Sequence, residues 1–228
     1  HELIHRKDNI RKALGIYVLA LQNYTWFRIE HVFGYHKYVA TKLDPATSKL
    51  NQNLYPFVIK SIYGGIKNSF NFEKKRLEKR KYKYLKNRMY QYTIISILYF
   101  SLASIFFGLK GFYFVLGISL VGTILTEIVN YIEHYGLERK MLSSGHFEPV
   151  REIHSWDSNF AVTNLSLFNL GKHSHHHAKF YDQYQKLTNQ KGNPVLPMGY
   201  TAAILLASIP PLWKNVMNPL AIARKEIK

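Results

Sequence analysis

The sequence predicts an all-α integral membrane protein, in which a transmembrane helical hairpin carries a histidine-rich metal-binding domain on the cytoplasmic side. Two observations lead to this fold class. Residues 92–130 are almost wholly apolar, with one break at Lys110-Gly111. Most of the 11 histidines lie in tight clusters before and after that run. Many imidazoles beside a membrane-like segment indicate a nitrogen-ligated metal centre at the bilayer surface.

Composition limits the kinds of site and partner. The 228 residues suffice for one domain with a substantial core, and we expect a single domain over residues 1–228. The absence of cysteine excludes thiolate zinc sites, cysteine-ligated iron–sulfur clusters and disulfides. A formal net charge of +17 indicates nucleic acid, anionic lipid or an acidic protein as a partner. We expect no nucleic acid, because no recognised nucleic-acid-binding motif accompanies the basic residues.

The first half of the chain predicts two surface elements. Residues 13–27 are apolar but interrupted by Gln22 and Asn23. They fall short of the roughly 20 apolar residues that cross a bilayer, so we expect an amphipathic helix lying on the surface. Residues 73–88, the basic segment, combine many lysines and arginines with interleaved tyrosines. Beside an apolar run, such a segment is typical of juxtamembrane sequences that bind anionic headgroups, and a solvated helix face is the alternative.

The central apolar run predicts the hairpin. We expect transmembrane helices at about residues 92–109 and 111–130, joined by a tight turn at residues 108–111. The alternative is a pair of buried helices in a globular protein. Basic residues precede the run and recur at Arg139 and Lys140, so both ends of the hairpin are expected to face the cytoplasm. Residues 201–213 are apolar but short, and we expect a packed or peripheral helix that ends at Pro210-Pro211.

The histidine spacings indicate shared helix faces. His1 and His5 are four residues apart, and His173, His176 and His177 follow an i, i+3, i+4 pattern. Neutral imidazole suits iron, copper, zinc and nickel, and so many nitrogens accommodate two metal ions more easily than one. An even number of membrane crossings separates the clusters, so all of them are expected to converge on the cytoplasmic face.

Acidic residues accompany the histidines and suggest support for the ligands. Glu2, Glu30 and Glu133 each lie one or two residues from a histidine. Carboxylates commonly accept the second N–H of a ligating imidazole. Salt bridges to nearby lysines and arginines are an equally good interpretation of each glutamate.

Several motifs together resemble one enzyme family. They are His-Glu-Leu-Ile-His-Arg at 1–6, Glu-His-Val-Phe-Gly-Tyr-His at 30–36, Val-Ala-Thr at 39–41, Asp-Pro-Ala at 44–46, Asn-Tyr-Ile-Glu-His-Tyr-Gly-Leu at 130–137, His-Ser-Trp-Asp-Ser-Asn at 154–159, Gly-Lys-His-Ser-His-His-His-Ala at 171–178, Leu-Pro-Met-Gly-Tyr at 196–200 and Pro-Pro-Leu-Trp at 210–213. In this order they resemble the alkane 1-monooxygenases and the xylene monooxygenase hydroxylase. These are membrane-bound, non-haem diiron hydroxylases of the fatty acid desaturase-like superfamily. The resemblance covers nearly the whole chain.

The resemblance implies a set of metal ligands, and this sequence departs from the family pattern at two positions. The implied metal ligands are His1, His5, His31, His36, His134, His173, His176 and His177. His154 is implied as a residue that supports the ligands, with a structural role as the alternative. Family members usually end the second motif with two adjacent histidines, and here the first is Tyr35. Tyr35 would then ligate as phenolate, leave an open position, or signal altered activity. His175 is an extra histidine and is not expected to ligate.

The resemblance also implies a reaction and its partners. It implies two iron ions, O₂ as co-substrate, and hydroxylation of unactivated C–H bonds of alkanes or alkyl-aromatics to alcohols. A fatty acyl desaturase or hydroxylase of the same superfamily, or a non-catalytic membrane metal-binding protein, are the alternatives. The expected electron donor is rubredoxin or a flavin/iron–sulfur reductase, docking near residues 74–88. The expected location is a bacterial inner membrane with the metal site facing the cytoplasm, and the family's upstream transmembrane helices lead us to expect a fragment.

Overall fold

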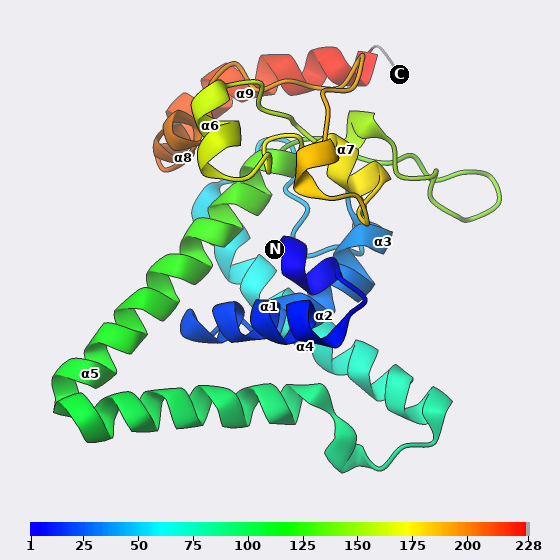
Figure 1. Ribbon diagram of the computed structural model, residues 1–228. Coiled ribbons are helices and arrows are strands. Elements are labelled where there is room, and N and C mark those ends of the chain that lie inside the picture. The colour runs from blue at the N-terminus through cyan, green and yellow to red at the C-terminus, as the bar shows by residue number, and fades with distance from the viewer. Residues whose placement is uncertain (227–228) are drawn as a thin grey trace. The chain divides into compact units, whose positions relative to one another are not determined.

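The computed structural model describes residues 1–226, and this part of the chain is predominantly helical (Figure 1). The helices in chain order are η1 Glu2–His5, α1 Asn9–Leu21, α2 Phe27–Glu30, η2 His31–Tyr35, α3 His36–Tyr38, α4 Leu54–Arg80, η3 Tyr84–Lys86, α5 Arg88–His134, η4 Glu152–His154, α6 Ala161–Ser166, α7 His173–Ala178, η5 Tyr184–Lys186, α8 Tyr200–Ala207 and α9 Pro210–Glu226. No strand forms within residues 1–226, where extended pairing is limited to isolated bridges. The predicted all-α character is confirmed.

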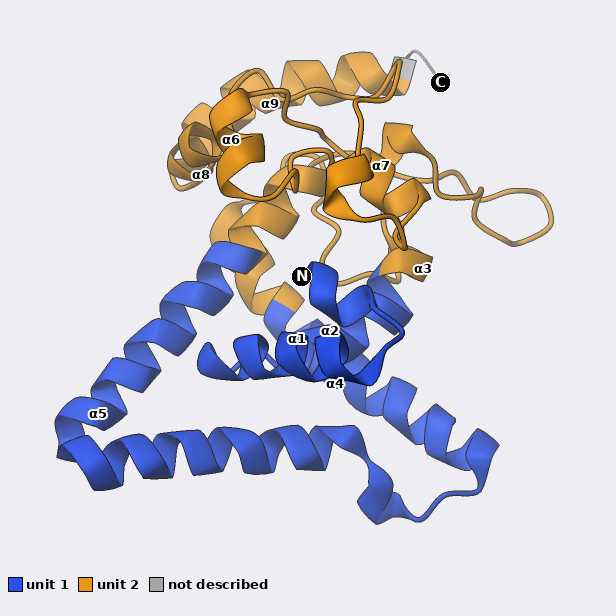
Figure 2. Cartoon of the chain, in the orientation of Figure 1, with its two compact units in different colours: residues 1–35, 62–126 blue, residues 36–61, 127–228 orange. Residues whose placement is uncertain are grey.

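The chain divides into two compact units, which Figure 2 colours separately. Unit 1 comprises residues 1–35 and 62–126, and unit 2 comprises residues 36–61 and the chain from residue 127 onward. Helices α4 and α5 each begin in one unit and end in the other. Whether residues 1–228 act as one functional domain stays a prediction.

Helix α5 contains both apolar stretches of the predicted hairpin. Its two straight arms meet at a bend at Gly108, whose φ of 59° and ψ of −151° lie in a region open only to glycine (Figure 1). The arms approach each other closely only at the bend, where a Cβ on Gly111 would lie 2.1 Å from the carbonyl oxygen of Ala103, and they diverge beyond it (Figure 1). The expected four-residue turn is therefore a single-residue bend, and the first arm begins at Arg88 rather than Tyr92.

The surface of α5 is unlike that of a core helix. Only 22% of its most apolar 18-residue window is buried, and among the described residues α5 is the helix long and apolar enough to cross a membrane. The exposed large apolar side chains of α5 include Ile94, Ile97, Leu98, Leu102, Ile105, Phe106, Phe107, Leu109, Tyr113, Phe114, Leu120 and Val121. An apolar surface of this extent is unfavourable in water, so α5 suits a membrane protein better than a globular core.

The expected surface helix at residues 13–27 is shifted. Helix α1 begins at Asn9 because the Asp8 side chain accepts a hydrogen bond from the Arg11 backbone N–H. It ends at Leu21, and Asn23 adopts a left-handed φ of 54°. The polar pair that interrupts the apolar pattern therefore ends the helix, and residue 27 begins α2.

The C-terminal prediction is wrong in its boundary. The apolar residues 201–213 form two helices rather than one, since α8 ends at Ala207 and α9 begins at Pro210. Proline fits the first turn of a helix, where its missing N–H removes no hydrogen bond. Pro210-Pro211 therefore starts a helix, and the buried Trp213 of α9 joins a cluster with Tyr131 of α5 and with Tyr135, which follows the end of α5.

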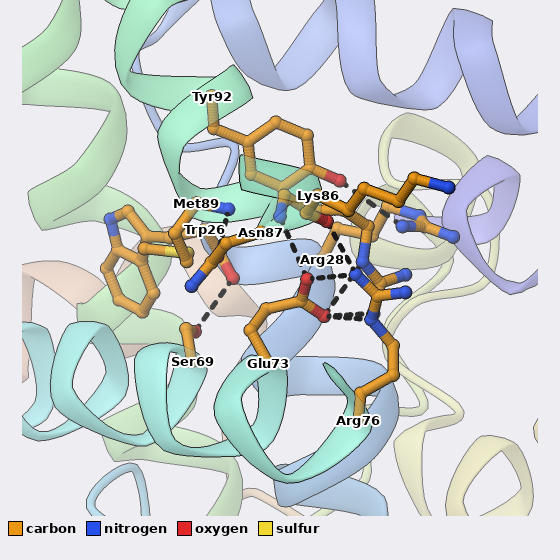
Figure 3. Close-up of polar contacts among 10 residues, drawn as sticks. Trp26, Arg28, Ser69, Glu73, Arg76, Lys86, Asn87, Met89 and Tyr92 are labelled. Atoms are coloured by element: carbon orange, nitrogen blue, oxygen red, sulfur yellow. Dashed lines mark hydrogen bonds and ion pairs between the residues drawn. The ribbon is translucent and has the colours of Figure 1, made fainter. Parts of the chain in front are cut away.

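The basic segment contains one fully buried carboxylate (Figure 3). Glu73 accepts hydrogen bonds from Arg76 Nε at 2.9 Å and Nη2 at 2.7 Å, and from Arg88 Nε at 2.8 Å and backbone N–H at 2.9 Å. Arg76 also donates to the Lys86 carbonyl at 2.9 Å. Burial alone raises the pKa of Glu73, but the bonds from Arg76 and Arg88 outweigh it and lower that pKa to about 2. Residues 81–88 are thus fastened to α4 rather than held only by solvent or lipid.

Candidate metal centre

Three predicted ligands meet in unit 1. The imidazole centroids of His1, His5 and His31 lie 5.1 Å (His1–His5), 4.6 Å (His1–His31) and 5.0 Å (His5–His31) apart. The Nε2 atoms of His1 and His31 face each other at 2.8 Å. Ring nitrogens this close, contributed by segments 30 residues apart in sequence, form a potential three-nitrogen site for one metal ion.

The first motif reaches this position by a different local structure from the one predicted. Glu2–His5 form a 3₁₀ turn, whereas the spacing of His1 and His5 predicted an α-helix. Ile4 of this turn is buried with Leu19 of α1, Tyr24 and Phe27. The turn lies so close to α1 that a Cβ on Gly15 would come within 3.0 Å of Ile4 Cγ2. Packing on α1 therefore fixes the turn that carries His5.

The second motif continues as a π-helix over His31–Tyr35, a local structure often found at functional sites. Tyr35, where the resemblance led us to expect histidine, is 1% exposed and stacks on the His31 ring with their centres 4.8 Å apart. Gly34 is required by close packing, because a Cβ there would lie 2.7 Å from Phe72 and 2.9 Å from a carboxylate oxygen of Glu30. Phe72 and Glu30 thus close one side of the π-helix.

Unit 2 brings together five further predicted ligands. The ligand atoms of His134, His173 and His177 lie within 4.8 Å of one another, and all three residues are buried. His173 and His177 face each other through Nε2 atoms 2.9 Å apart. The His36 ring lies 5.0 Å from that of His176 and 4.8 Å from that of His177. The i, i+3, i+4 pattern is carried by the short helix α7, as the spacing predicted.

Two acceptors orient these imidazoles. Glu133 Oε2 lies 3.1 Å from His173 Nε2, and the Tyr200 hydroxyl donates to Glu133 Oε1 at 2.8 Å. His134 Nδ1 lies 3.0 Å from the backbone carbonyl of His154. The contact on His134 Nδ1 fixes the tautomer of that ring and leaves its Nε2 for a metal, whereas Glu133 faces the same His173 nitrogen that faces His177 and so lies at the candidate metal position itself.

The other predicted supporting residues differ in what they contact. His154 touches His134 through its carbonyl, while its own ring accepts from the Arg151 backbone N–H at 3.0 Å. Glu2 forms an ion pair with Arg6, the salt-bridge alternative that the sequence left open. Glu30 is buried against Gly34.

Asp157 is a supporting residue that the sequence analysis missed. It is fully buried, and it accepts from the Ser174 backbone N–H at 2.7 Å and from the Ser174 hydroxyl at 2.8 Å. Asn193 donates to the same carboxylate. These bonds fix the first turn of α7, directly beside His173. Asp157 and Tyr200 both lie inside motifs quoted above, but no spacing rule links residues so far apart in sequence.

His175 has a separate role from its neighbours in α7. Its Nδ1 accepts from the Thr188 backbone N–H at 2.9 Å and faces Gln190 Nε2 at 3.1 Å. It therefore connects α7 to the following loop, which agrees with leaving it out of the ligand set.

The electrostatics of the unit 2 cluster suit metal binding. Burial lowers the pKa of His36 and of His134 to about 3, and at His36 the nearby His134 contributes to that shift. Burial, followed by the adjacent histidines, also lowers the pKa of His173 and His177 well below the ordinary value. These rings are neutral at pH 7, which leaves a lone pair on each for a metal ion. A donor set of neutral imidazoles with a buried carboxylate nearby fits iron, copper or zinc.

Comparison with known proteins places the chain beside monooxygenases and within a desaturase family. The family model described as fatty acid desaturase matches residues 1–191. Alkane 1-monooxygenase 2 of Alcanivorax borkumensis is 42% identical over 96% of this chain and 58% of its own length. Alkane 1-monooxygenase 2 of Pseudomonas aeruginosa is 41% identical over 96% of this chain and 59% of its own length. The xylene/toluene monooxygenase hydroxylase component of Pseudomonas putida is 26% identical over 93% of this chain and 57% of its own length. The chain therefore spans less than two thirds of the length of these relatives.

Proposed function

The chain belongs to the fatty acid desaturase family, and we propose that it hydroxylates unactivated C–H bonds of alkanes or alkyl-aromatics at a histidine-ligated diiron centre. One observation carries the proposal. Eight histidines from four separated segments gather into two clusters of ring nitrogens, in a chain similar to alkane 1-monooxygenases over 96% of its length. A structural or storage role would not require ligands from so many segments.

Each cluster would hold one iron ion. In unit 1 the ligands would be His1, His5 and His31; in unit 2 they would be His134, His173 and His177, with His36 and His176 completing the set. Iron, when bound, supplies the O₂ chemistry that inserts one oxygen atom into a C–H bond and, with two electrons and two protons, releases the other as water.

The chain's own residues would hold and shield that centre. Glu133 would lie beside the ligating nitrogen of His173 while Tyr200 holds the carboxylate in place. Asp157 would fix the start of α7, so that His173 and His177 keep their positions. Burial of the unit 2 imidazoles would keep them neutral and exclude water from the ligands.

The two arms of α5 would form a transmembrane hairpin. The exposed apolar surface of α5 supports lipid contact. Basic residues lie before the first arm and, as Arg139 and Lys140, after the second. They would keep both ends of the hairpin on the cytoplasmic side of a bacterial inner membrane. An apolar substrate without a polar group would be selected only by the shape of an apolar pocket, so selectivity for chain length should be soft.

The electron donor would be an acidic protein, rubredoxin or a flavin/iron–sulfur reductase. The basic segment exposes Lys74, Lys75, Lys79 and Lys83, and the buried Glu73 cluster holds the segment in a fixed shape. Complementary charge mainly raises the rate of encounter. Donor turnover should therefore fall at high salt.

Desaturation or hydroxylation of a fatty acyl chain is the second candidate, favoured by the family model that matches residues 1–191. The two reactions differ in product, because hydroxylation gives an alcohol and desaturation gives an alkene.

The test is product analysis with the full-length protein, reconstituted in lipid with iron, a reductase and rubredoxin. We expect O₂-dependent conversion of octane or xylene to the alcohol. His176→Ala should abolish this activity, whereas His146→Ala, at an exposed histidine outside both clusters, should retain it. An alkene product would favour the second candidate, and iron-loaded protein that consumes no O₂ with any of these substrates would refute an oxygenase.

A further inference from the structure

Unit 2 contains a cavity of about 330 Å³ that none of the predicted metal ligands lines. Its wall comes from two segments, residues 40–60 and residues 138–147. Four of the lining side chains are cationic, namely Lys42, Lys49, Lys60 and Arg139, and two are acidic, namely Asp44 and Glu138. The excess of cationic side chains gives the cavity a positive potential.

The carboxylate of Asp44 is hydrogen-bonded within its own loop. Asp44 is 3% exposed, and its two oxygens accept from the Ala46 backbone N–H at 2.9 Å and from the Thr47 hydroxyl at 2.6 Å. Burial raises the pKa of Asp44 to about 6, with these bonds opposing the shift. Asp44 therefore shapes the wall of the cavity, and its charge also attracts Lys60.

Arg139 is fixed in place by neutral acceptors. Its Nε donates to the Glu148 carbonyl at 2.7 Å, and its Nη1 donates to the carbonyls of Lys37 at 2.9 Å and Val39 at 3.3 Å. Each of these acceptors is a main-chain oxygen, so the bonds orient the guanidinium without cancelling its charge; the nearby charge of Glu148 opposes burial, but burial still lowers the pKa of Arg139. A half-buried cation is costly unless a counter-charge is supplied.

Lys60 repeats this arrangement on the opposite segment. Its Nζ donates to the Thr47 carbonyl at 3.1 Å and lies 5.3 Å from the centre of the Phe57 ring. Burial lowers the pKa of Lys60, as expected for a cation held away from water, and outweighs the opposing charges of Asp44 and Glu127. Two oriented, partly buried cations thus face one cavity, and the exposed Lys42 and Lys49 stand at its wall.

We infer that this cavity binds a small phosphate-bearing anion. Arginine and lysine together are the residues that recognise phosphate, arginine through its planar fork and lysine as a point charge. Small-ligand sites have volumes of about 300–1,000 Å³, and this cavity lies at the lower end of that range. A cavity of this size suits a phosphate group better than a protein partner. Met141 and Phe147 add apolar side chains to the wall of the cavity. The phosphate could therefore belong to a lipid headgroup or be free phosphate, because the cations would bind both in the same way.

The test measures the thermal unfolding midpoint of the full-length protein in detergent. Inorganic phosphate should raise the midpoint above that in chloride at equal ionic strength, because a ligand that binds only the folded state stabilises it. The double variant Lys42→Gln/Lys49→Gln should need at least about tenfold more phosphate for the same shift, since each charge-assisted bond contributes about that factor. The control Lys67→Gln/Lys75→Gln removes two exposed charges of α4 outside the cavity and should respond like the wild type.

Two short-chain lipids separate the sources of phosphate. The natural ligand is an anionic lipid headgroup if dihexanoyl phosphatidate raises the midpoint at a lower concentration than inorganic phosphate does, and dihexanoyl phosphatidylcholine does not. If phosphatidate and inorganic phosphate raise the midpoint at equal concentrations, the natural ligand is free phosphate. The inference is overturned if phosphate and chloride act alike, if both double variants lose the shift equally, or if only an acidic peptide raises the midpoint. It does not depend on the proposed oxygenase activity, since the binding is measured without turnover.

Discussion

Replacing Glu73 by glutamine tests whether the buried ion cluster fixes the basic segment. The substitution keeps the size of the side chain but removes the charge that Arg76 and Arg88 share. It also weakens the bond that the Arg88 backbone N–H donates at 2.9 Å. Both guanidinium groups would then lie beside a neutral amide, and residues 81–88 should detach from α4 more often.

The magnitude follows from the depressed pKa. The pKa of Glu73 falls from 4.5 to about 2, as its bonds to the arginines outweigh its burial. A shift of one unit corresponds to about 1.4 kcal/mol, so the cluster contributes up to about 3 kcal/mol, within the cost of breaking a buried pair. The arginine side chains are 25% and 22% exposed, so solvent screening makes this value an upper bound.

Hydrogen exchange at residues 82–89 measures the effect. The Glu73→Gln variant should exchange the Arg88 amide up to about 100-fold faster than wild type, the factor that corresponds to about 3 kcal/mol. Glu78→Gln is the matched control, because Glu78 lies on the same helix but is exposed, and its exchange should stay unchanged. Equal effects of both variants, or no effect of either, would refute the reasoning.

The same cluster predicts a pH dependence with a defined sign. Because the folded-state pKa of Glu73 is depressed, its stabilisation is complete above about pH 4.5 and is lost as pH falls toward 2. The protection of Arg88 should decline in this window in the wild type. The Glu73→Gln variant should lack that part of the decline.

Three further substitutions test other parts of the structure. Tyr35→His should raise iron occupancy if the stacked tyrosine replaces a ligand; an unchanged iron content would show that Tyr35 leaves the site intact. Asp157→Asn should weaken iron binding about 10- to 100-fold, because the amide cannot accept both Ser174 bonds, and an unaltered iron titration would argue against this role. Gly108→Ala should lower the thermal midpoint through about 1–3 kcal/mol of backbone strain, and an unchanged midpoint would show that the bend relaxes freely.

The sequence allowed prediction of those features that depend on local patterns. The continuous apolar run predicted the helical arms of α5, and the i, i+3, i+4 spacing predicted that α7 presents several histidines. The ends of the helices were less predictable, because each depends on the backbone conformation of one or two residues. The glycine backbone at 108 and the helix-initiating Pro210 changed the turn and the C-terminal helix.

The supporting contacts could not be predicted, because they join residues far apart in sequence. The bond between Tyr200 and Glu133 spans 67 residues, and that between Asp157 and Ser174 spans 17. The burial of Glu73 was hidden in the same way, since an acid among many basic residues is typical of a solvated face. Its partner Arg88 lies 15 residues away, and only the fold brings it close.

Iron content is the most direct test of the central claim. The full-length protein, purified in detergent and loaded under anaerobic conditions, should contain two iron ions per chain. His176→Ala should reduce that number, while His146→Ala should not. Zinc alone in the wild type, or less than one iron per chain, would contradict the diiron centre on which the proposed hydroxylation depends.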